Sequence, residues 1–138
     1  ESFAGARDVI ADNWALGAGI GNYAKYNANM ANSNYANDKD NFLPAWEYQP
    51  VHNVFLLVWS EIGIFGLAFF IGLFLFGAYY ALRRRTETKD KTEIYKFGLL
   101  MAMVVMFMVD HWWWSLHFGV IFFWLILGFL FQEKNKIK

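Results

Sequence analysis

The feature that most constrains this chain is an uninterrupted apolar run. From Ile62 to Leu82, 21 consecutive residues carry no charged side chain. As a helix rising ~1.5 Å per residue, this run would cross the ~30 Å hydrocarbon layer of a bilayer. A second apolar stretch, Phe97 to Phe131, is interrupted near its middle by Asp110 and His111. A single helix of that length would leave Asp110 in the bilayer, so we predict two helices with a tight turn at this point.

The composition is typical of a membrane protein. The chain of 138 residues is 57% hydrophobic and 21% aromatic, and only 17% of its residues are charged. A net charge of zero removes the basic field that a nucleic-acid partner would need. The absence of cysteine excludes a disulfide framework, a thiolate metal site and a cysteine nucleophile. Because the sequence begins with Glu1 and shows no signal-peptide pattern, we expect it to be a piece of a longer protein.

The distribution of basic residues predicts an orientation. After the first span come Arg83, Arg84, Arg85, Lys89, Lys91 and Lys96, and after the last come Lys134, Lys136 and Lys138. The positive-inside rule places both groups in the cytoplasm and the N-terminal segment on the other side. Interfacial aromatic residues agree with this orientation. The outer belt would contain Trp46, Tyr48 and Trp112 to Trp114, and the inner one Tyr79 and Tyr80.

These patterns predict an all-α integral membrane fold in two parts. Residues 1–52 would form an extracytoplasmic segment, made of an amphipathic helix, a glycine turn and an irregular loop. Residues 53–138 would form the transmembrane region, with helices at about 53–82, 95–111 and 115–132. A cytoplasmic loop, 83–94, would join the first two helices, and glycines such as Gly63, Gly66, Gly72 and Gly77 would let neighbouring helices approach closely.

The first residues are predicted to form an amphipathic helix. Its apolar positions recur at helical spacing, at Phe3, Ala6, Ile10 and Trp14. Asp8 and Asp12 fall on the opposite side, and Arg7 lies on the flank of the apolar stripe. Two interpretations of Arg7 are open. It either snorkels to lipid headgroups or contacts an anion inside a cavity.

The segment after this helix reads as a turn and a loop. The motif GAGIGN, Gly17 to Asn22, resembles a phosphate-binding loop superficially, but no strand precedes it, which argues against a dinucleotide role. We interpret it as a flexible turn. The stretch from Asn22 to Asn41 is rich in asparagine and is predicted to be an irregular, solvated loop. Pro44 and Pro50 bracket a short extended stretch that leads to His52.

Four ionisable residues lie at the predicted outer rim. His52 and Glu61 are nine residues apart, so on one helix they would face opposite ways. For Glu61 a structural role is favoured, in a cluster with Asp110 and His111 that joins helices. For His52 a functional role gains weight, because an ordinary imidazole pKa of ~6.5 suits proton transfer near neutrality.

A metal site made of His52, His111 and a carboxylate is conceivable from the residue types. No ligand spacing such as HxxxH supports it, and we therefore predict no metal and no cofactor. The third histidine, His117, reads as a packed or interfacial residue.

The stretch VHNVFLLVWSEIGIFGLAFF resembles the His-Asn-x-x-Leu-x-x-x-x-Glu-x-Gly-x-x-Gly signature of the O-antigen ligase and polymerase superfamily. The signature positions are His52, Asn53, Leu56, Glu61, Gly63 and Gly66. Upstream, ARDVIADNWALGAGIGNY is similar to that family's arginine-containing helix and glycine-rich turn, although the usual proline before the glycines is missing. Downstream, DHWWWSLHFGVIFFWLILG resembles its Asp-His-aromatic turn and final helix.

This resemblance implies the C-terminal part of a many-span glycosyltransferase of the GT-C type in the bacterial inner membrane. Such enzymes take a glycan from a polyprenyl-diphosphate carrier on the periplasmic side and pass it to a hydroxyl of lipid A core, a polysaccharide or a protein. His52 would be the base, and Arg7 would hold the diphosphate. Asn53, Glu61, Asp110 and His111 would support them. Membrane lipids and missing N-terminal spans would be the other partners, and the fragment alone would be inactive.

Two other classes remain open from the residues alone. The chain would be part of a transporter or channel if Glu61, Asp110 and His111 formed an ion relay. Their predicted place at the rim, away from the bilayer midplane, argues against this. Alternatively, the chain would be a structural membrane subunit without chemistry, in which case replacing His52 would leave surface glycan unchanged.

Overall fold

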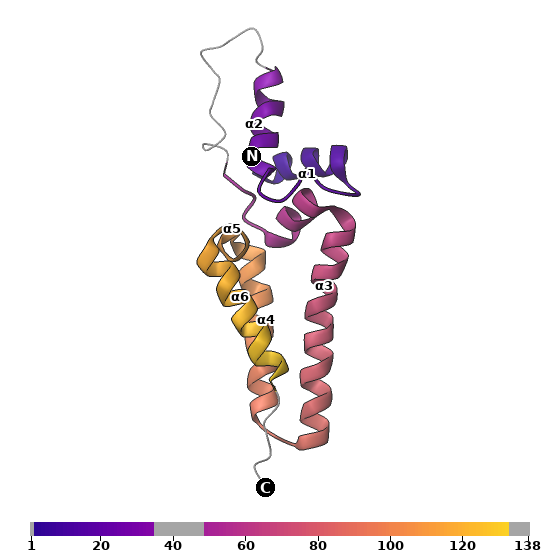
Figure 1. Ribbon diagram of the computed structural model, residues 1–138, viewed down its shortest axis with the longest axis vertical. Helices are drawn as coiled ribbons and strands as arrows, with labels where there is room; N and C mark the ends of the chain where they lie inside the picture. Colours follow the sequence, from indigo (N-terminus) through magenta and orange to yellow (C-terminus); the bar gives the residue numbers. More distant parts are fainter. Residues whose placement is uncertain (1, 35–48, 133–138) are drawn as a thin grey trace.

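A computed structural model describes residues 2–34 and 49–132, and within these ranges the regular secondary structure is all helical, joined by turns and short loops (Figure 1). The helices are α1 (Ser2–Asn13), α2 (Tyr23–Asn34), α3 (Val54–Thr88), α4 (Thr92–Val109), α5 (Trp112–Ser115) and α6 (His117–Phe131). Three of them, α3, α4 and α6, form an elongated bundle. α1 lies across one end of this bundle, and α2 points away from it. The prediction of an all-helical chain is therefore confirmed for the described residues.

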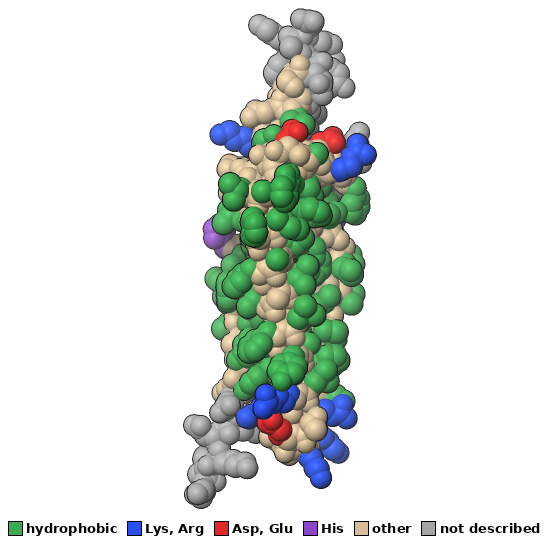
Figure 2. Space-filling model, turned by 90° about the vertical axis from the view of Figure 1, so that its right-hand side faces the viewer, with side chains coloured by type: hydrophobic (Ala, Val, Ile, Leu, Met, Phe, Trp, Pro, Cys, Tyr) green, Lys and Arg blue, Asp and Glu red, His purple; other side chains and the backbone are tan. Residues whose placement is uncertain are grey.

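Two helices in the described part of the chain, α3 and α4, are long and apolar enough to cross a membrane. α6 is more apolar still but has only 15 residues. Figure 2 shows a broad band of hydrophobic side chains along the bundle, with charged side chains gathered at its two ends. The separation of charge from the apolar band is what a segment embedded in lipid requires.

The exterior of the bundle also has the properties that a segment embedded in lipid requires. Large apolar side chains project outward from all three of its helices. Examples are Phe65, Phe69, Leu75, Val105, Met108, Val109, Ile121 and Leu125. A soluble monomer rarely exposes so large a continuous apolar surface. The outer surface of the bundle is therefore suited to contact with lipid or with other apolar surfaces.

The interior of the bundle is built from aromatic rings. Phe70 and Phe74 of α3 meet Phe107 of α4 and Phe123 of α6, and all four are buried. The rings of Phe70 and Phe107 stack with their centroids 5.7 Å apart, whereas Phe74 meets Phe107 edge-on at 5.6 Å. Since lipid is as apolar as these side chains, close packing rather than removal from water holds such helices together.

α3 extends further than the sequence suggested. The helix was predicted to end near residue 82 and to be followed by a loop at 83–94, but it continues to Thr88. An ion pair between Arg83 and Glu87, 2.9 Å apart and one turn apart, favours this extra length. Lys89 then ends the helix in a left-handed conformation, and its N–H donates to the carbonyl of Arg85. Only a short turn remains before α4.

The asparagine-rich stretch is not irregular throughout, because α2 occupies its first part, up to Asn34. Tyr23 and Ala28 are buried, and Tyr23 belongs to a core with Ala6 and Val9 of α1. Packing against α1 therefore outweighs the weak helix propensity of asparagine.

The buried face of α1 is also shifted from the predicted one. Ala6 is buried as expected, but its companion is Val9 rather than Phe3 or Trp14, which are both exposed. The small side chain at Ala6 allows α1 to lie close to its neighbours. The large apolar residues near the two ends of α1, Phe3 and Trp14, are left facing outward.

The glycine motif does not form a free turn. It lies against a break in α3, where Gly63 has φ 72° and ψ −174°. The carbonyls of Ser60 and Glu61, which lose their helical partners, accept hydrogen bonds from the N–H groups of Ala18 and Gly19, both at 2.8 Å. In return, the N–H of Ile64 donates to the carbonyl of Trp14 at 2.9 Å. Backbone groups freed inside an apolar region must find partners, and this segment supplies them.

Glycine is required on both sides of this contact. A β-carbon at Gly63 would overlap the backbone carbonyl of Ala15, and one at Gly17 would overlap the backbone of Glu61. Both glycines also have positive φ angles. We call this arrangement the glycine clasp: residues 14–19 held against Ser60 to Ile64. The expectation that Gly63 permits close approach therefore holds, but the partner is a loop rather than a helix.

The opposite end of the bundle contains a buried ion pair. Lys96 and Glu93 lie 3.5 Å apart in the first turns of α4, and the Nζ of Lys96 donates to the carbonyl of Gln132 at 2.8 Å. Lys96 was counted among the cytoplasmic cations after the first span, but it is buried and ties α4 to the end of α6.

Several predictions fall outside the described residues. They concern residues 35–41 of the asparagine-rich loop, Pro44, the belt residues Trp46 and Tyr48, and the terminal Lys134, Lys136 and Lys138.

Candidate functional site

His52 lies at a bend immediately before α3. The next residue, Asn53, is the N-cap of this helix, and its side-chain oxygen accepts a hydrogen bond from the N–H of Leu56 at 3.1 Å. An N-cap has extended backbone angles, here φ −147° and ψ 112°, so the chain turns sharply where the helix begins. The pair His-Asn therefore places the imidazole of His52 off the end of α3, with its side chain 54% exposed.

Asp110 and His111 occupy the turn between α4 and α5. Asp110 ends α4 in an extended conformation, and its N–H donates to the carbonyl of Met106 at 3.0 Å. The Oδ1 atom of Asp110 accepts a hydrogen bond from the backbone N–H of His111 at 2.7 Å. This contact fixes the carboxylate at the turn and directs it toward the segment that holds His52.

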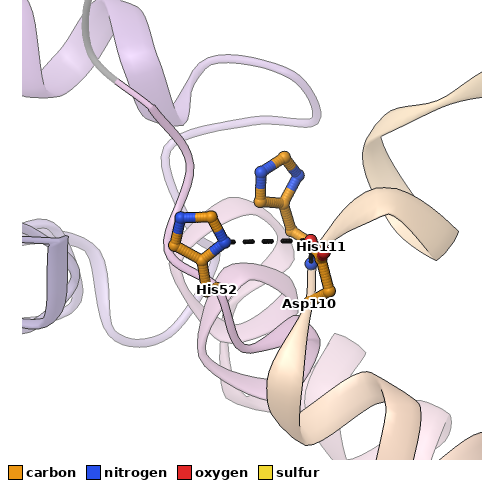
Figure 3. A group of neighbouring side chains, drawn as sticks. All are labelled: His52, Asp110 and His111. Atoms are coloured by element: carbon orange, nitrogen blue, oxygen red, sulfur yellow. Dashed lines mark hydrogen bonds and ion pairs between the residues drawn. The ribbon is translucent and has the colours of Figure 1, made fainter.

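The fold brings these three residues together, as Figure 3 shows. His52 Nδ1 lies 3.8 Å from Asp110 Oδ1, and the two imidazole rings have centroids 5.1 Å apart with a tilt of 45°. One donor atom from each residue falls within 4.8 Å of the others. We call this group the His-Asp-His cluster: His52, Asp110 and His111.

Burial differs sharply within the cluster. His111 is buried, whereas His52 is exposed and Asp110 is intermediate. Burial lowers the pKa of His111 because it penalises the imidazolium. The nearby charge of Asp110 partly offsets this, and His52 adds to the lowering. His111 therefore favours its neutral form, and its Nδ1 is hydrogen-bonded to Ser115 Oγ at 3.0 Å.

Glu61 lies close to this turn but has a different partner. Its side chain is buried, and Oε2 accepts a hydrogen bond from Trp114 Nε1 of α5 at 2.9 Å. The backbone carbonyl of the same residue is held by the glycine clasp. Glu61 thus joins α3 to α5 and to the segment between α1 and α2, although its contact to the turn runs through Trp114 instead of Asp110 or His111.

Arg7 is not part of the cluster. Its side chain is 82% exposed and lies 3.5 Å from the carboxylate of Asp8, its neighbour on α1. An exposed pair of this kind contributes little to stability. α1 does lie at the same end of the molecule as α5 and the start of α3 (Figure 1). The guanidinium is therefore exposed at this end, with the carboxylate of Asp8 beside it.

Two residues at the turn were not singled out from the sequence. Trp114, which the sequence placed in an aromatic belt, holds Glu61, and Ser115 holds His111. The separation of Ser115 from His111 by four residues was a usable signal, since residues one helical turn apart meet. The contact of Trp114 with Glu61 is long-range and left no such signal. His117 is exposed at the start of α6.

An apolar pocket of about 270 Å³ opens beside the turn. It is lined by Met106, Trp112, Trp113, Phe118, Gly119 and Phe122. Two of its lining residues, Trp112 and Trp113, directly follow His111 in the chain.

Chemically, the cluster offers an exposed imidazole with a carboxylate on one side. A carboxylate beside Nδ1 orients the ring and strengthens Nε2 as a proton acceptor. The separation of 3.8 Å is longer than a hydrogen bond, and apo sites commonly tighten on substrate binding. The arrangement suits the removal of a proton from a hydroxyl group.

Comparisons with protein-family models, with curated proteins and with solved structures found no match for this chain. The resemblance to the O-antigen ligase and polymerase superfamily therefore rests on the motif residues alone.

Proposed function

We propose that this chain is the C-terminal part of a membrane glycan ligase or polymerase. It would transfer a glycan from a polyprenyl-diphosphate carrier to an acceptor hydroxyl on the extracytoplasmic face of a bacterial inner membrane. In this proposal α6 forms a third span beside α3 and α4, and the charged turn at 89–91 is cytoplasmic. The missing parts of the site come from earlier spans of a larger GT-C-type fold.

The observation that carries the proposal is the pairing of His52 with Asp110 at one end of two membrane-length helices. His52 Nε2 would take the proton of the acceptor hydroxyl, and Asp110 would hold the ring through Nδ1. The acceptor oxygen then forms a bond to the anomeric carbon as the bond to the diphosphate oxygen breaks. The electron pair of that bond leaves with the diphosphate, and the anomeric centre is inverted.

Two further features support a diphosphate-linked lipid as donor. Arg7 presents an exposed guanidinium at the same end of the molecule, and this group binds phosphate oxygens through two parallel N–H groups. The apolar pocket beside the turn has a lining that suits part of an isoprenoid chain. Transfer from such a donor requires three elements: a catalytic base for the acceptor hydroxyl, an anion-binding group and an apolar slot.

The test compares variants of the full-length protein for transfer of a polyprenyl-diphosphate-linked glycan in membranes. His52→Ala is expected to reduce transfer by about 10²- to 10⁴-fold, the usual contribution of a general base. Asp110→Asn is expected to reduce it by about 10- to 100-fold through loss of orientation. Arg7→Lys should also impair transfer, because lysine lacks the planar fork.

His117→Ala is the matched control, because His117 is an exposed histidine outside the cluster, and it should retain transfer. Protein levels are measured in parallel by quantitative blotting. Normal transfer in His52→Ala at normal protein level would overturn the proposal and favour a structural subunit. A changed ion flux instead of a changed glycan would favour a channel.

A further inference from the structure

The His-Asp-His cluster has a chemistry that the proposed proton transfer does not use. Two imidazoles and a carboxylate are the ligand types that zinc and similar divalent transition metals prefer. Such a set is not evident from the local sequence, because His52 is far along the chain from Asp110 and His111. We infer that His52, Asp110 and His111 form a binding site for a divalent transition metal of the zinc type.

The distances are close to those of a metal site. Zinc bonds of about 2.0–2.2 Å place tetrahedral ligand atoms roughly 3.3 Å apart. In the cluster the donor atoms lie within 4.8 Å of one another, so a shift of about 1–1.5 Å closes the site. His52 can make this shift, because its side chain is half-exposed and the residue lies at a bend outside the helices, before the N-cap Asn53.

The surroundings of His111 are those of a metal ligand. Its Nδ1 is hydrogen-bonded to Ser115 Oγ at 3.0 Å. When Nδ1–H donates to this hydroxyl, the lone pair of Nε2 is free, and such outer contacts are what fix the ring of a metal-binding histidine. Asp110 is held in the same way, because Oδ1 accepts the backbone N–H of His111 at 2.7 Å.

A bound metal would act as a regulator of the proposed site. Coordination occupies one nitrogen of His52 and the carboxylate of Asp110, and these are the groups that the proton transfer needs. Zinc therefore inhibits transfer, and a chelator restores it. This consequence rests on the proposed function, whereas the binding of metal does not.

Metal binding is tested on the full-length protein in detergent, after treatment with a chelator. Zinc chloride is titrated by calorimetry, and cobalt(II) is followed by its visible absorption. We expect one site, at least tenfold weaker in His52→Ala and in His111→Ala. Ser115→Ala is expected to weaken it by about 10- to 100-fold through loss of the outer contact. His117→Ala is the matched control and should bind as the unaltered protein does.

Melting curves of the metal-free variants show whether each one is folded. If an alanine variant does not fold, the isosteric variant Asp110→Asn takes its place. Equal affinity in the unaltered protein, His52→Ala and His111→Ala would overturn the site, as would loss of binding in His117→Ala alone. If zinc binds as expected but the protein transfers no glycan, the metal site stands and only the proposed function fails.

Discussion

At the scale of single residues, Glu61 illustrates how one side chain serves several elements. Its carboxylate accepts the Nε1–H of Trp114, and its backbone carbonyl accepts the N–H of Gly19. A buried carboxylate is tolerated only when it is well paired, because an unpaired one loses its hydration without compensation. The contacts of Glu61 are therefore structural ones, where α3 meets α5 and the segment between α1 and α2.

Glu61→Gln is expected to lower the folded yield while transfer per folded molecule is retained. The hydrogen bond to Trp114 would change from a charged one of about 1.5–3 kcal/mol to a neutral one of about 0.5–1.5 kcal/mol. Thermal unfolding in detergent, followed by tryptophan fluorescence, measures the loss. If the interaction is direct, the double variant Glu61→Gln with Trp114→Phe should cost less than the sum of the two single changes. Full yield with abolished turnover would instead place Glu61 in the chemistry.

At the scale of elements, the glycine clasp determines how the outer segment meets the bundle. α3 is interrupted at Gly63, and the carbonyls that this break exposes are paired with the segment between α1 and α2. The side chain of Trp59 adds a hydrogen bond from Nε1 to the carbonyl of Trp14 at 3.1 Å. The position of α1, and hence of Arg7, thus depends on a break in a helix some 50 residues away.

Gly63→Ala is expected to destabilise the protein strongly. The backbone angles at Gly63 belong to a region that is almost exclusive to glycine, which alone costs about 1–3 kcal/mol. In addition, the new methyl group would overlap the carbonyl of Ala15. Gly72→Ala is the matched control on the same helix, because nothing lies within 4 Å of the β-carbon there. Thermal unfolding of both variants in one detergent makes the comparison. Equal melting temperatures would show that the clasp contributes nothing.

At the scale of the whole molecule, the two ends of the bundle differ in charge. Arg83, Arg84 and Arg85 lie at the end of α3, and Lys89 and Lys91 follow in the turn to α4. The other end carries the His-Asp-His cluster, α1 and α2 (Figure 1). By the positive-inside rule, the arginine-rich end should be cytoplasmic.

The absence of native cysteine from this chain makes its orientation easy to test with single cysteines. Asn29 on α2 and Thr86 near the end of α3 are both exposed and lie at opposite ends. In intact cells a membrane-impermeant maleimide is expected to label Asn29→Cys and to leave Thr86→Cys unmodified until the membrane is permeabilised. The reverse pattern would place the cluster in the cytoplasm, where the proposed reaction has no donor.

Much of the bundle was predictable from short-range pattern. The uncharged run before Arg83 and the interruption at Asp110 predicted membrane-length helices and a tight turn, and the structure has both. The errors lie where packing overrides composition. α2 forms in an asparagine-rich stretch because Tyr23 and Ala28 are buried, and α3 continues to Thr88 through an ion pair within its last turns.

The candidate site was predictable only as a set of separate residues. Asn53 can be predicted as an N-cap because it precedes an apolar run, and this places His52 just outside the helix. Three contacts could not be predicted from the local sequence: His52 with Asp110, His52 with His111, and Trp114 with Glu61. Each of these contacts joins residues that are separated along the chain by α4 and by most or all of α3.

The sequence by itself therefore determined where the apolar helices lie along the chain and how their ends differ in charge, because both depend on local composition. Only the tertiary structure decided which side chains share one site. That choice depends on the break at Gly63 and on how α3, α4 and α6 pack, and both result from contacts between distant residues.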